Sequence, residues 1–190
     1  MQSHFYAVLS RMKNIYRWGL MRNTREENLS EHSLEVALIA HCLAIIGNRR
    51  LGKNLNPEFI ACSAVFHDTS EIITGDMPTP IKYYNSDIKT TYKEIEKTAD
   101  EKLLSLLPDD LREDFIPLYN PDEESKKIIK AADKISALIK CIEETNMGNR
   151  EFEAARKSLQ QVILDMDLVE ANIFMEEFLS SFYLTLDEQL

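Results

Sequence analysis

Apolar residues recur every three or four positions near the start of the chain, as they do along one face of an α-helix. A first segment of this kind covers residues 3–16, with Ser3 as the expected N-cap. A second covers residues 30–47, with Ser30 as the expected N-cap and Gly47 as the expected C-cap. We therefore predict an amphipathic helix in each segment.

The same periodicity continues along the chain and predicts further helices. One begins at Pro57, a residue well suited to a first helical turn, and extends through Glu71. In the loop that follows, residues 74–80, two prolines stiffen the backbone and Gly75 permits a sharp exit. The remaining predicted helices cover residues 86–107, part of 108–121, 122–146, 151–165 and 168–182. No linker or repeat divides the chain, so we predict an all-α, single-domain fold over residues 1–190, with a core over about 28–145 and C-terminal helices, about 150–183, packed on it.

Composition supports an ordered globular protein and narrows its partners. The 190 residues are 44% hydrophobic and include five glycines, which suits one domain with a buried core. Acidic residues outnumber basic residues by 32 to 22, and the resulting net charge of −10 disfavours duplex nucleic acid and anionic membranes as partners. A small anionic substrate is compatible with this charge where a metal ion or an arginine reverses the local field.

Three features predict where the protein is found. The N-terminal stretch lacks the uninterrupted apolar run of a signal peptide. The longest apolar run, residues 36–46, is interrupted by His41 and is too short to span a bilayer. The cysteines at 42, 62 and 141 are widely spaced among apolar neighbours, so we expect three buried thiols in a reducing compartment. We therefore predict a soluble, cytoplasmic protein.

Four polar residues fall on apolar helix faces, where burial without a partner is costly. His67 and Asp68 are adjacent in the apolar segment that precedes the loop with glycine and prolines. His32 lies one turn before the apolar stripe of the second helix, and Asp133 lies inside the stripe of a later helix. Each of these groups needs a partner, and a divalent metal is the candidate that satisfies all four.

These residues also have ordinary structural interpretations. A single histidine such as His32 on an apolar face is usually a hydrogen-bonded core residue. Asp133 can instead form a salt bridge with Lys130 or Lys134. Trp18 is compatible with a core position, and the arginines around it are compatible with a solvated surface.

Taken together, the four residues offer two imidazole nitrogens and two carboxylates from three helices. This mixed set suits Mn²⁺, Co²⁺, Fe²⁺, Ni²⁺ or Zn²⁺ better than Ca²⁺ or Mg²⁺. Four ligands on an octahedral ion leave two positions for water and a substrate oxygen, which is the requirement for metal-assisted hydrolysis. Glu71 follows His67 by one turn and adds a carboxylate that can relay a proton.

The order of these residues carries a family resemblance. His32, the pair His67 and Asp68, and Asp133 form an H…HD…D signature that resembles the HD-domain superfamily of metal-dependent phosphohydrolases. Three longer blocks and the whole length of the chain are similar to the YfbR-type bacterial 5′-deoxynucleotidases. The blocks are NIYRWGLMRNTREENLSEHSLEVALIAH, FHDTSEIITGDMPTPIKYYN and KAADKISALIKCIEE.

The resemblance implies an HD-type helical bundle, a homodimer, and hydrolysis of deoxyribonucleoside 5′-monophosphates to deoxyribonucleoside and phosphate. It implies one divalent transition metal (Co, Mn, Zn, Ni or Fe) held by the four signature residues. Arg17 would orient the phosphate, and Glu71 would be the general acid or base. The substrate would contact Arg17, Trp18, the ligands His32, Asp68 and Asp133, and the loop residues Asp76, Met77, Pro78 and Thr79.

The chemistry of the sugar site follows from two of these residues. Trp18 can place a flat wall where an extra 2′-hydroxyl would clash or stay unsatisfied. Asp76 can accept a hydrogen bond from the 3′-hydroxyl.

Other functions use the same residues. A different HD phosphohydrolase, acting on a deoxynucleoside triphosphate or a cyclic nucleotide, would keep the ligands and differ in the shape of its pocket. A nucleotide-binding HD module without activity would bind tightly without turnover, but Glu71 beside a complete ligand set argues against it. A serine or cysteine hydrolase is disfavoured because the chain has no GxSxG or comparable nucleophile context.

Overall fold

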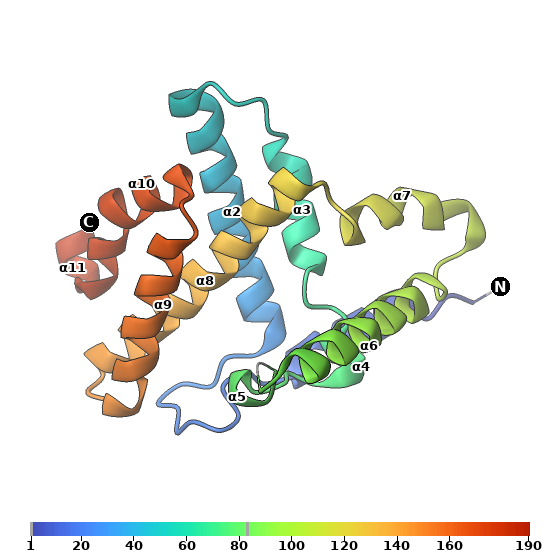
Figure 1. Ribbon diagram of the computed structural model, residues 1–190, viewed down its shortest axis with the longest axis horizontal. Coiled ribbons are helices and arrows are strands. Elements are labelled where there is room, and N and C mark those ends of the chain that lie inside the picture. Colours follow the sequence, from blue (N-terminus) through green and yellow to red (C-terminus); the bar gives the residue numbers. More distant parts are fainter. Residues whose placement is uncertain (1, 83) are drawn as a thin grey trace.

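The regular elements of the computed structural model, which describes residues 2–82 and 84–190, are all helical (Figure 1). Within these residues no β-strand forms, and an isolated antiparallel bridge joins Tyr16 to Asn28. In chain order the elements are α1 (Phe5–Leu9), η1 (Ser10–Asn14), α2 (Leu29–Leu51), α3 (Pro57–Phe66), α4 (Glu71–Thr74), α5 (Thr79–Lys82), α6 (Ser86–Leu104), α7 (Asp109–Tyr119), α8 (Glu123–Asn146), η2 (Arg150–Phe152), α9 (Glu153–Asp165), α10 (Val169–Glu177), η3 (Leu179–Tyr183) and α11 (Leu186–Gln189). The predicted all-α class is confirmed.

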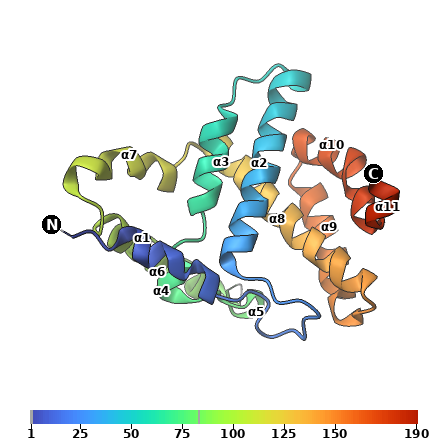
Figure 2. The same cartoon turned by 180° about the vertical axis from the view of Figure 1, so that it is seen from behind.

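The main core lies between α2, α3 and α8. Helices α2 and α3 run antiparallel side by side, and α8 crosses behind them in the view of Figure 2. Fully buried apolar side chains meet there, including Val36 and Leu43 of α2, Ile60 of α3 and Ile135 of α8. Helices α9 and α10 pack on α8 and α2 on the side away from α3 (Figure 1). The packing of three core helices therefore fixes the relative positions of their polar residues.

A second, smaller core joins α1, α6 and α7 beside the main bundle (Figure 2). Phe5 and Leu103 are fully buried in it. Phe66, the last residue of α3, contacts the rings of Phe115 and Tyr119 at centroid distances of 6.0 and 5.4 Å. The end of α3, where the predicted metal ligands begin, is thereby attached to the second core.

Helix α2 is longer than its periodicity predicts. Asn28, not Ser30, is its N-cap, because the Asn28 side chain accepts from the backbone N–H of Glu31 while the Glu31 side chain accepts from the N–H of Asn28. Gly47 lies inside the helix, which ends at Leu51 with Gly52 as a left-handed C-cap. A Cβ atom at Gly47 would lie 3.0 Å from Oε1 of Glu170, so this glycine serves close packing and not termination.

The first predicted helix is divided and starts later than expected. Helix α1 begins at Phe5, with His4 at the N-cap position, and a 3₁₀ turn follows it. Ser3 still accepts from the N–H of Phe5 at 3.3 Å, while its hydroxyl donates to the carbonyl of Leu106 at 2.7 Å. The hydroxyl therefore ties the N-terminus to the second core.

The apolar run of residues 36–46 lies in a core helix, and one expectation about the cysteines needs correction. The apolar run of residues 36–46 belongs to α2, and this helix is long and apolar enough to cross a membrane, although 56% of its apolar window is buried inside the protein, as in a core helix. Of the cysteines, Cys141 is buried, Cys42 is half-buried and Cys62 is exposed, so the prediction of three buried thiols is wrong for Cys62.

Candidate metal centre

The predicted ligands His67 and Asp68 lie in a turn between two helices. We expected them to share one helix with Glu71, but α3 ends at Phe66 and α4 begins at Glu71. Thr69 causes part of this break, because its hydroxyl and its backbone N–H both donate to the carbonyl of Phe66. The N–H of Glu71 then donates to the carbonyl of Asp68 at 3.0 Å. The turn still keeps all three side chains at the same end of α3.

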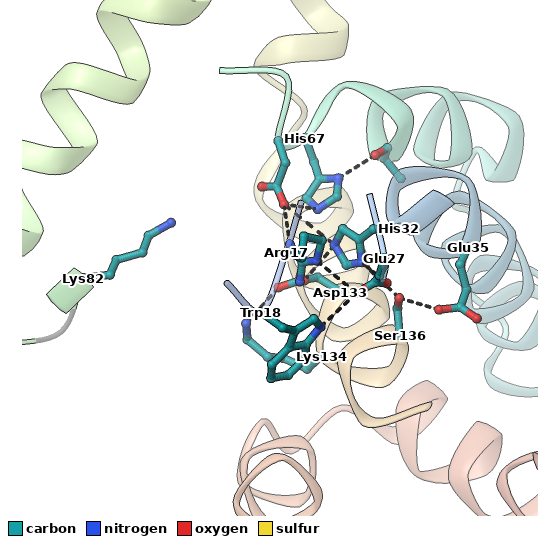
Figure 3. Close-up of polar contacts among 12 residues, drawn as sticks. Arg17, Trp18, Glu27, His32, Glu35, His67, Lys82, Asp133, Lys134 and Ser136 are labelled. Atoms are coloured by element: carbon teal, nitrogen blue, oxygen red, sulfur yellow. Dashed lines mark hydrogen bonds and ion pairs between the residues drawn. The ribbon is translucent and has the colours of Figure 1, made fainter. Parts of the chain in front are cut away.

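The structure brings the four predicted ligands together from α2, the turn after α3, and α8. One ligand atom from each of His32, His67, Asp68 and Asp133 lies within 4.8 Å of the others, so the group can hold a metal ion. Nε2 of His32 lies 3.3 Å from Oδ1 of Asp133 and 3.7 Å from Oδ2 of Asp68. Nε2 of His67 lies 3.1 Å from the same oxygen of Asp68. Figure 3 shows the side chains of His32, His67 and Asp133 converging.

A backbone carbonyl fixes the tautomer of His67. Its Nδ1 atom lies 2.7 Å from the carbonyl oxygen of Ala64, which can only accept a hydrogen bond. In its neutral form, which is the form that binds a metal, His67 therefore carries its proton on Nδ1, and the lone pair of Nε2 points into the cluster.

A relay of two side-chain hydrogen bonds, through Ser136 to Glu35, fixes the tautomer of His32. Nδ1 of His32 lies 3.1 Å from Oγ of Ser136, and the Ser136 hydroxyl donates to Oε2 of Glu35 at 2.6 Å (Figure 3). Because the Ser136 hydroxyl donates its proton to Glu35, the Ser136 oxygen accepts a hydrogen bond from Nδ1–H of His32. Nε2 of His32 is again left with a free lone pair. Ser136 and Glu35 are not among the predicted site residues, although Ser136 follows Asp133, and Glu35 follows His32, by three residues.

The donor set fits a divalent ion. Nε2 of His32 and Nε2 of His67 are both buried without a hydrogen-bond partner, which is costly unless another group uses the lone pairs. Burial opposes ionisation of Asp68, but the nearby His67 outweighs it and holds the pKa of Asp68 below its usual range. Burial likewise opposes ionisation of Asp133, yet His32 and Lys134 hold the pKa of Asp133 well below its usual value. Two half-buried carboxylates and two imidazole nitrogens form a ligand set suited to a cation.

The alternative salt bridge of Asp133 also exists. Nζ of Lys134 lies 2.8 Å from Oδ2 of Asp133, while Oδ1 faces His32. The two interpretations are therefore compatible, because each uses a different oxygen of the carboxylate.

Arg17 lies at the edge of the cluster and is not a solvated surface residue. Its Nη1 atom is 3.5 Å from Oδ2 of Asp68, and its Nε atom is 3.5 Å from Oε2 of Glu27. The neighbouring Trp18 donates its indole N–H to Oε2 of Glu27 at 2.8 Å. Glu27 is a further site residue that sequence analysis missed, because it lies in a loop without periodicity.

Glu71 and Asp76 lie close to the ligands in a region of negative charge. Glu71 is buried, and its Oε2 atom has no hydrogen-bond partner. Burial, then repulsion from Asp68 and Asp76, raises the pKa of Glu71 to about 9. Burial also raises the pKa of Asp76, although Arg17 and a hydrogen bond from the Trp18 backbone oppose the rise. Asp76 therefore lies beside Trp18.

The other predicted residues of the loop are less buried than Glu71. Met77 and Pro78 are half-buried and Thr79 is exposed at the start of α5. Lys82 at the end of α5 binds Glu96 at 2.8 Å, and its charge acts on Glu71 and Asp68. On another side of the ligands, a cavity of about 250 Å³ has His67 and Asp133 among its lining residues.

Comparison with known sequences identifies the family. Residues 4–182 match the profile of the family described as 5′-deoxynucleotidase YfbR-like. The chain belongs to the YfbR-like 5′-deoxynucleotidase family. Among its relatives, the 5′-deoxynucleotidase YfbR of Salmonella arizonae is 52% identical over 98% of this chain and 96% of the relative. The 5′-deoxynucleotidase of Cronobacter sakazakii is 50% identical with the same coverage.

Solved structures place the YfbR-like chain among HD-type folds. An HD-domain phosphohydrolase of Listeria innocua has a TM-score of 0.82 at 24% identity, over 94% of this chain and 88% of that one. The HD phosphohydrolase of cyanophage S-2L, solved with dA and one catalytic Zn²⁺ ion, has a TM-score of 0.67 at 21% identity, over 93% and 95%. The predicted HD-type bundle is confirmed by these likenesses.

Proposed function

We propose that this protein is a metal-dependent 5′-deoxynucleotidase that hydrolyses deoxyribonucleoside 5′-monophosphates to deoxyribonucleoside and phosphate. Two relatives that are named 5′-deoxynucleotidase share about half of their residues with this chain. The similarity extends over nearly the full length of each relative. The observation that carries the proposal is the position of Arg17, whose guanidinium lies 3.5 Å from Asp68 of the ligand cluster. A cation beside a divalent metal site is suited to a phosphate group.

The proposed ligands are His32, His67, Asp68 and Asp133, and the ion is a divalent transition metal such as Co, Mn, Zn, Ni or Fe. When bound, such an ion supplies Lewis-acid stabilisation of phosphate charge and activates water for attack. The chain's own residues bind the phosphate, move protons and shape the sugar site.

Arg17 and Glu71 have the two catalytic roles. The Arg17 guanidinium donates to phosphate oxygens and neutralises the charge that develops on them as the phosphorus–oxygen bond breaks. Glu71 exchanges a proton with the attacking water or the departing 5′-oxygen, for which its burial and its raised pKa are suitable. We expect Glu71→Gln to bind metal and nucleotide but to lose turnover, and unchanged turnover would remove Glu71 from the mechanism.

Specificity for deoxyribose is assigned to Trp18 and to the loop of residues 76–79. Trp18 forms a flat wall against the 2′-carbon, and Asp76 accepts from the 3′-hydroxyl. Met77, Pro78 and Thr79 complete the wall of the sugar site beside the ligands His32, Asp68 and Asp133.

An assay of phosphate release tests the function. Deoxyribonucleoside and ribonucleoside 5′-monophosphates are incubated with the protein and each of several divalent metals. We expect inorganic phosphate from the deoxy compounds. Release of triphosphate from a deoxynucleoside triphosphate, or opening of a cyclic nucleotide, would instead support another HD phosphohydrolase, and tight binding without any release would support a binding module.

We also propose a homodimer in the cytoplasm, with α2 at the interface. Leu34, Leu38 and Ile45 of α2 are 60%, 65% and 38% exposed and follow one another at helical spacing. Exposed Glu31 and Arg49 flank this stripe at opposite ends. Two antiparallel copies of α2 would bring Leu34 against Ile45 and Glu31 near Arg49, as a two-fold interface requires. The three cysteines are free, which is typical of a reducing compartment.

A further inference from the structure

The carboxylate of Glu27 contacts three groups of the candidate site at once (Figure 3). Its Oε2 atom accepts a hydrogen bond of 2.8 Å from the indole N–H of Trp18 and lies 3.5 Å from Nε of Arg17. Its Oε1 atom lies 3.7 Å from Nδ1 of His32. The side chain is only 12% exposed, so these contacts form away from bulk solvent, where electrostatic interactions are stronger.

The backbone holds Glu27 opposite Arg17. The N–H of Arg17 donates to the carbonyl of Glu27 at 3.0 Å, and the N–H of Leu29 donates to the carbonyl of Ile15 at 2.8 Å. Residues 15–17 and 27–29 are thus paired in antiparallel fashion at the start of α2. Glu27 is therefore held next to Arg17 by this pairing, just before the start of the helix that carries His32.

Trp18 depends on support from its surroundings. Its backbone φ is 60°, a left-handed conformation that residues other than glycine rarely adopt. Its indole ring contacts Phe152 at a centroid distance of 5.3 Å, at an interplanar angle of 57°. In the part of the chain that the structure describes, Glu27 is the hydrogen-bond partner of the indole N–H. Without that carboxylate the ring can rotate about its side-chain bonds, and the wall it forms is no longer fixed.

We propose that Glu27 is a positioning residue that holds the indole of Trp18 and the guanidinium of Arg17 in register with the ligand His32. This inference rests on the proposed function, in which Trp18 selects deoxyribose and Arg17 binds the phosphate. Glu27 acts through these residues and makes the selection for deoxyribose depend on the metal-bearing helix α2.

Two variants separate the hydrogen bond from the charge. Glu27→Ala removes both, whereas Glu27→Gln keeps an oxygen that can accept from the indole N–H. Trp18 is the protein's single tryptophan, so intrinsic fluorescence reports on its ring directly. The matched control is Glu26→Ala, which removes an exposed carboxylate from the neighbouring position.

The experiment measures three quantities: acrylamide quenching of fluorescence in nucleotide-free protein, KM and kcat for a deoxyribonucleoside monophosphate, and the ratio of kcat/KM for deoxy over ribo substrates. We expect Glu27→Ala to increase quenching and to lower the deoxy-over-ribo ratio about tenfold, as for loss of a buried hydrogen bond. Glu27→Gln should keep the wild-type quenching and ratio but raise KM about tenfold through weaker alignment of Arg17. Glu26→Ala should match the wild type in all three.

Two results would overturn the proposal. Wild-type quenching together with a wild-type ratio in Glu27→Ala would show that Glu27 does not position Trp18. If Glu27→Ala does not fold, an unchanged KM in Glu27→Gln overturns the link to Arg17. Failure of the proposed function can be distinguished from failure of this inference. If the wild type releases no phosphate, the proposed function fails, but the quenching of its fluorescence can still be compared with that of the variants.

Discussion

Nε2 of His32 on α2 lies 3.3 Å from Oδ1 of Asp133 on α8, which connects two helices that are distant in sequence. The same two helices pack against each other in the main core. Formation of the core therefore also brings these two proposed metal ligands together. The arrangement is preorganised, since Nε2 of each imidazole already faces the carboxylates.

Removal of Asp133 should abolish stabilisation by metal. We expect Co²⁺ at about 100 times its dissociation constant to raise the wild-type melting temperature by roughly 5–10 °C, since ligand binding stabilises the folded state. Asp133→Ala should show no such increase. Asp114→Ala, which removes an exposed carboxylate of α7, is the control and should respond as the wild type does. Differential scanning calorimetry with and without Co²⁺ makes the comparison, and a full metal response in Asp133→Ala would exclude it as a ligand.

The relay from His32 to Glu35 should affect metal affinity more than the chemical step. Ser136→Ala removes the acceptor for Nδ1–H of His32, so we expect Co²⁺ affinity to fall about 10- to 100-fold, the usual effect of losing such a partner. Saturating Co²⁺ should restore most of the turnover. Ser33→Ala is the matched control, because the Ser33 hydroxyl is buried with no hydrogen-bond partner. Equilibrium dialysis measures the affinities, and a Co²⁺ affinity equal to that of the wild type would contradict the role of the relay.

The sequence predicted the helices and the ligand cluster because both depend on local or strongly marked signals. Apolar periodicity marks helix interiors, and His32, His67, Asp68 and Asp133 stand out as polar residues on apolar faces. The ends of α2 were not predictable in the same way. Asn28 and Ser30 are both good N-caps, and the choice between them depends on the reciprocal bond with Glu31.

Contacts between segments that are distant in the sequence could not be predicted from the sequence alone. Glu27 lies in a loop, and its role depends on the pairing of residues 15–17 with 27–29. The interior position of Gly47 depends on the approach of Glu170, far along the chain. Neither effect leaves a periodic pattern, so only the folded structure reveals them.

The buried carboxylate of Glu144 should make stability depend on acidic pH. It accepts hydrogen bonds from the backbone N–H groups of Thr24 and Arg25 and from Asn149, and it pairs with Lys140. Burial opposes its ionisation, but Lys140 and the other donors lower the pKa of Glu144 to about 2. A lowered pKa means that the stabilisation is complete above the ordinary value of 4.5 and is lost as pH falls towards 2.

We therefore expect Glu144→Gln to be less stable than the wild type at pH 7 by about 3 kcal/mol, with a smaller difference at pH 3. Urea unfolding at several pH values measures this difference. Glu143→Gln, one residue earlier, is the control and should show little change at any pH. A difference between Glu144→Gln and the wild type that does not vary with pH would contradict the assignment.

The exposed stripe of α2 should mediate self-association. Leu38 lies near the middle of the stripe, so Leu38→Glu places two like charges close together at the proposed two-fold axis and should produce a monomer. Leu186→Glu changes a similarly exposed leucine on α11 and should leave the dimer intact. Arg49→Glu should weaken the dimer, and the further change Glu31→Arg should restore it, because the two charges are exchanged across the interface. Sedimentation velocity over a range of concentrations distinguishes these outcomes: a monomeric wild type would rule out the dimer, while a dimeric Leu38→Glu would place its interface elsewhere.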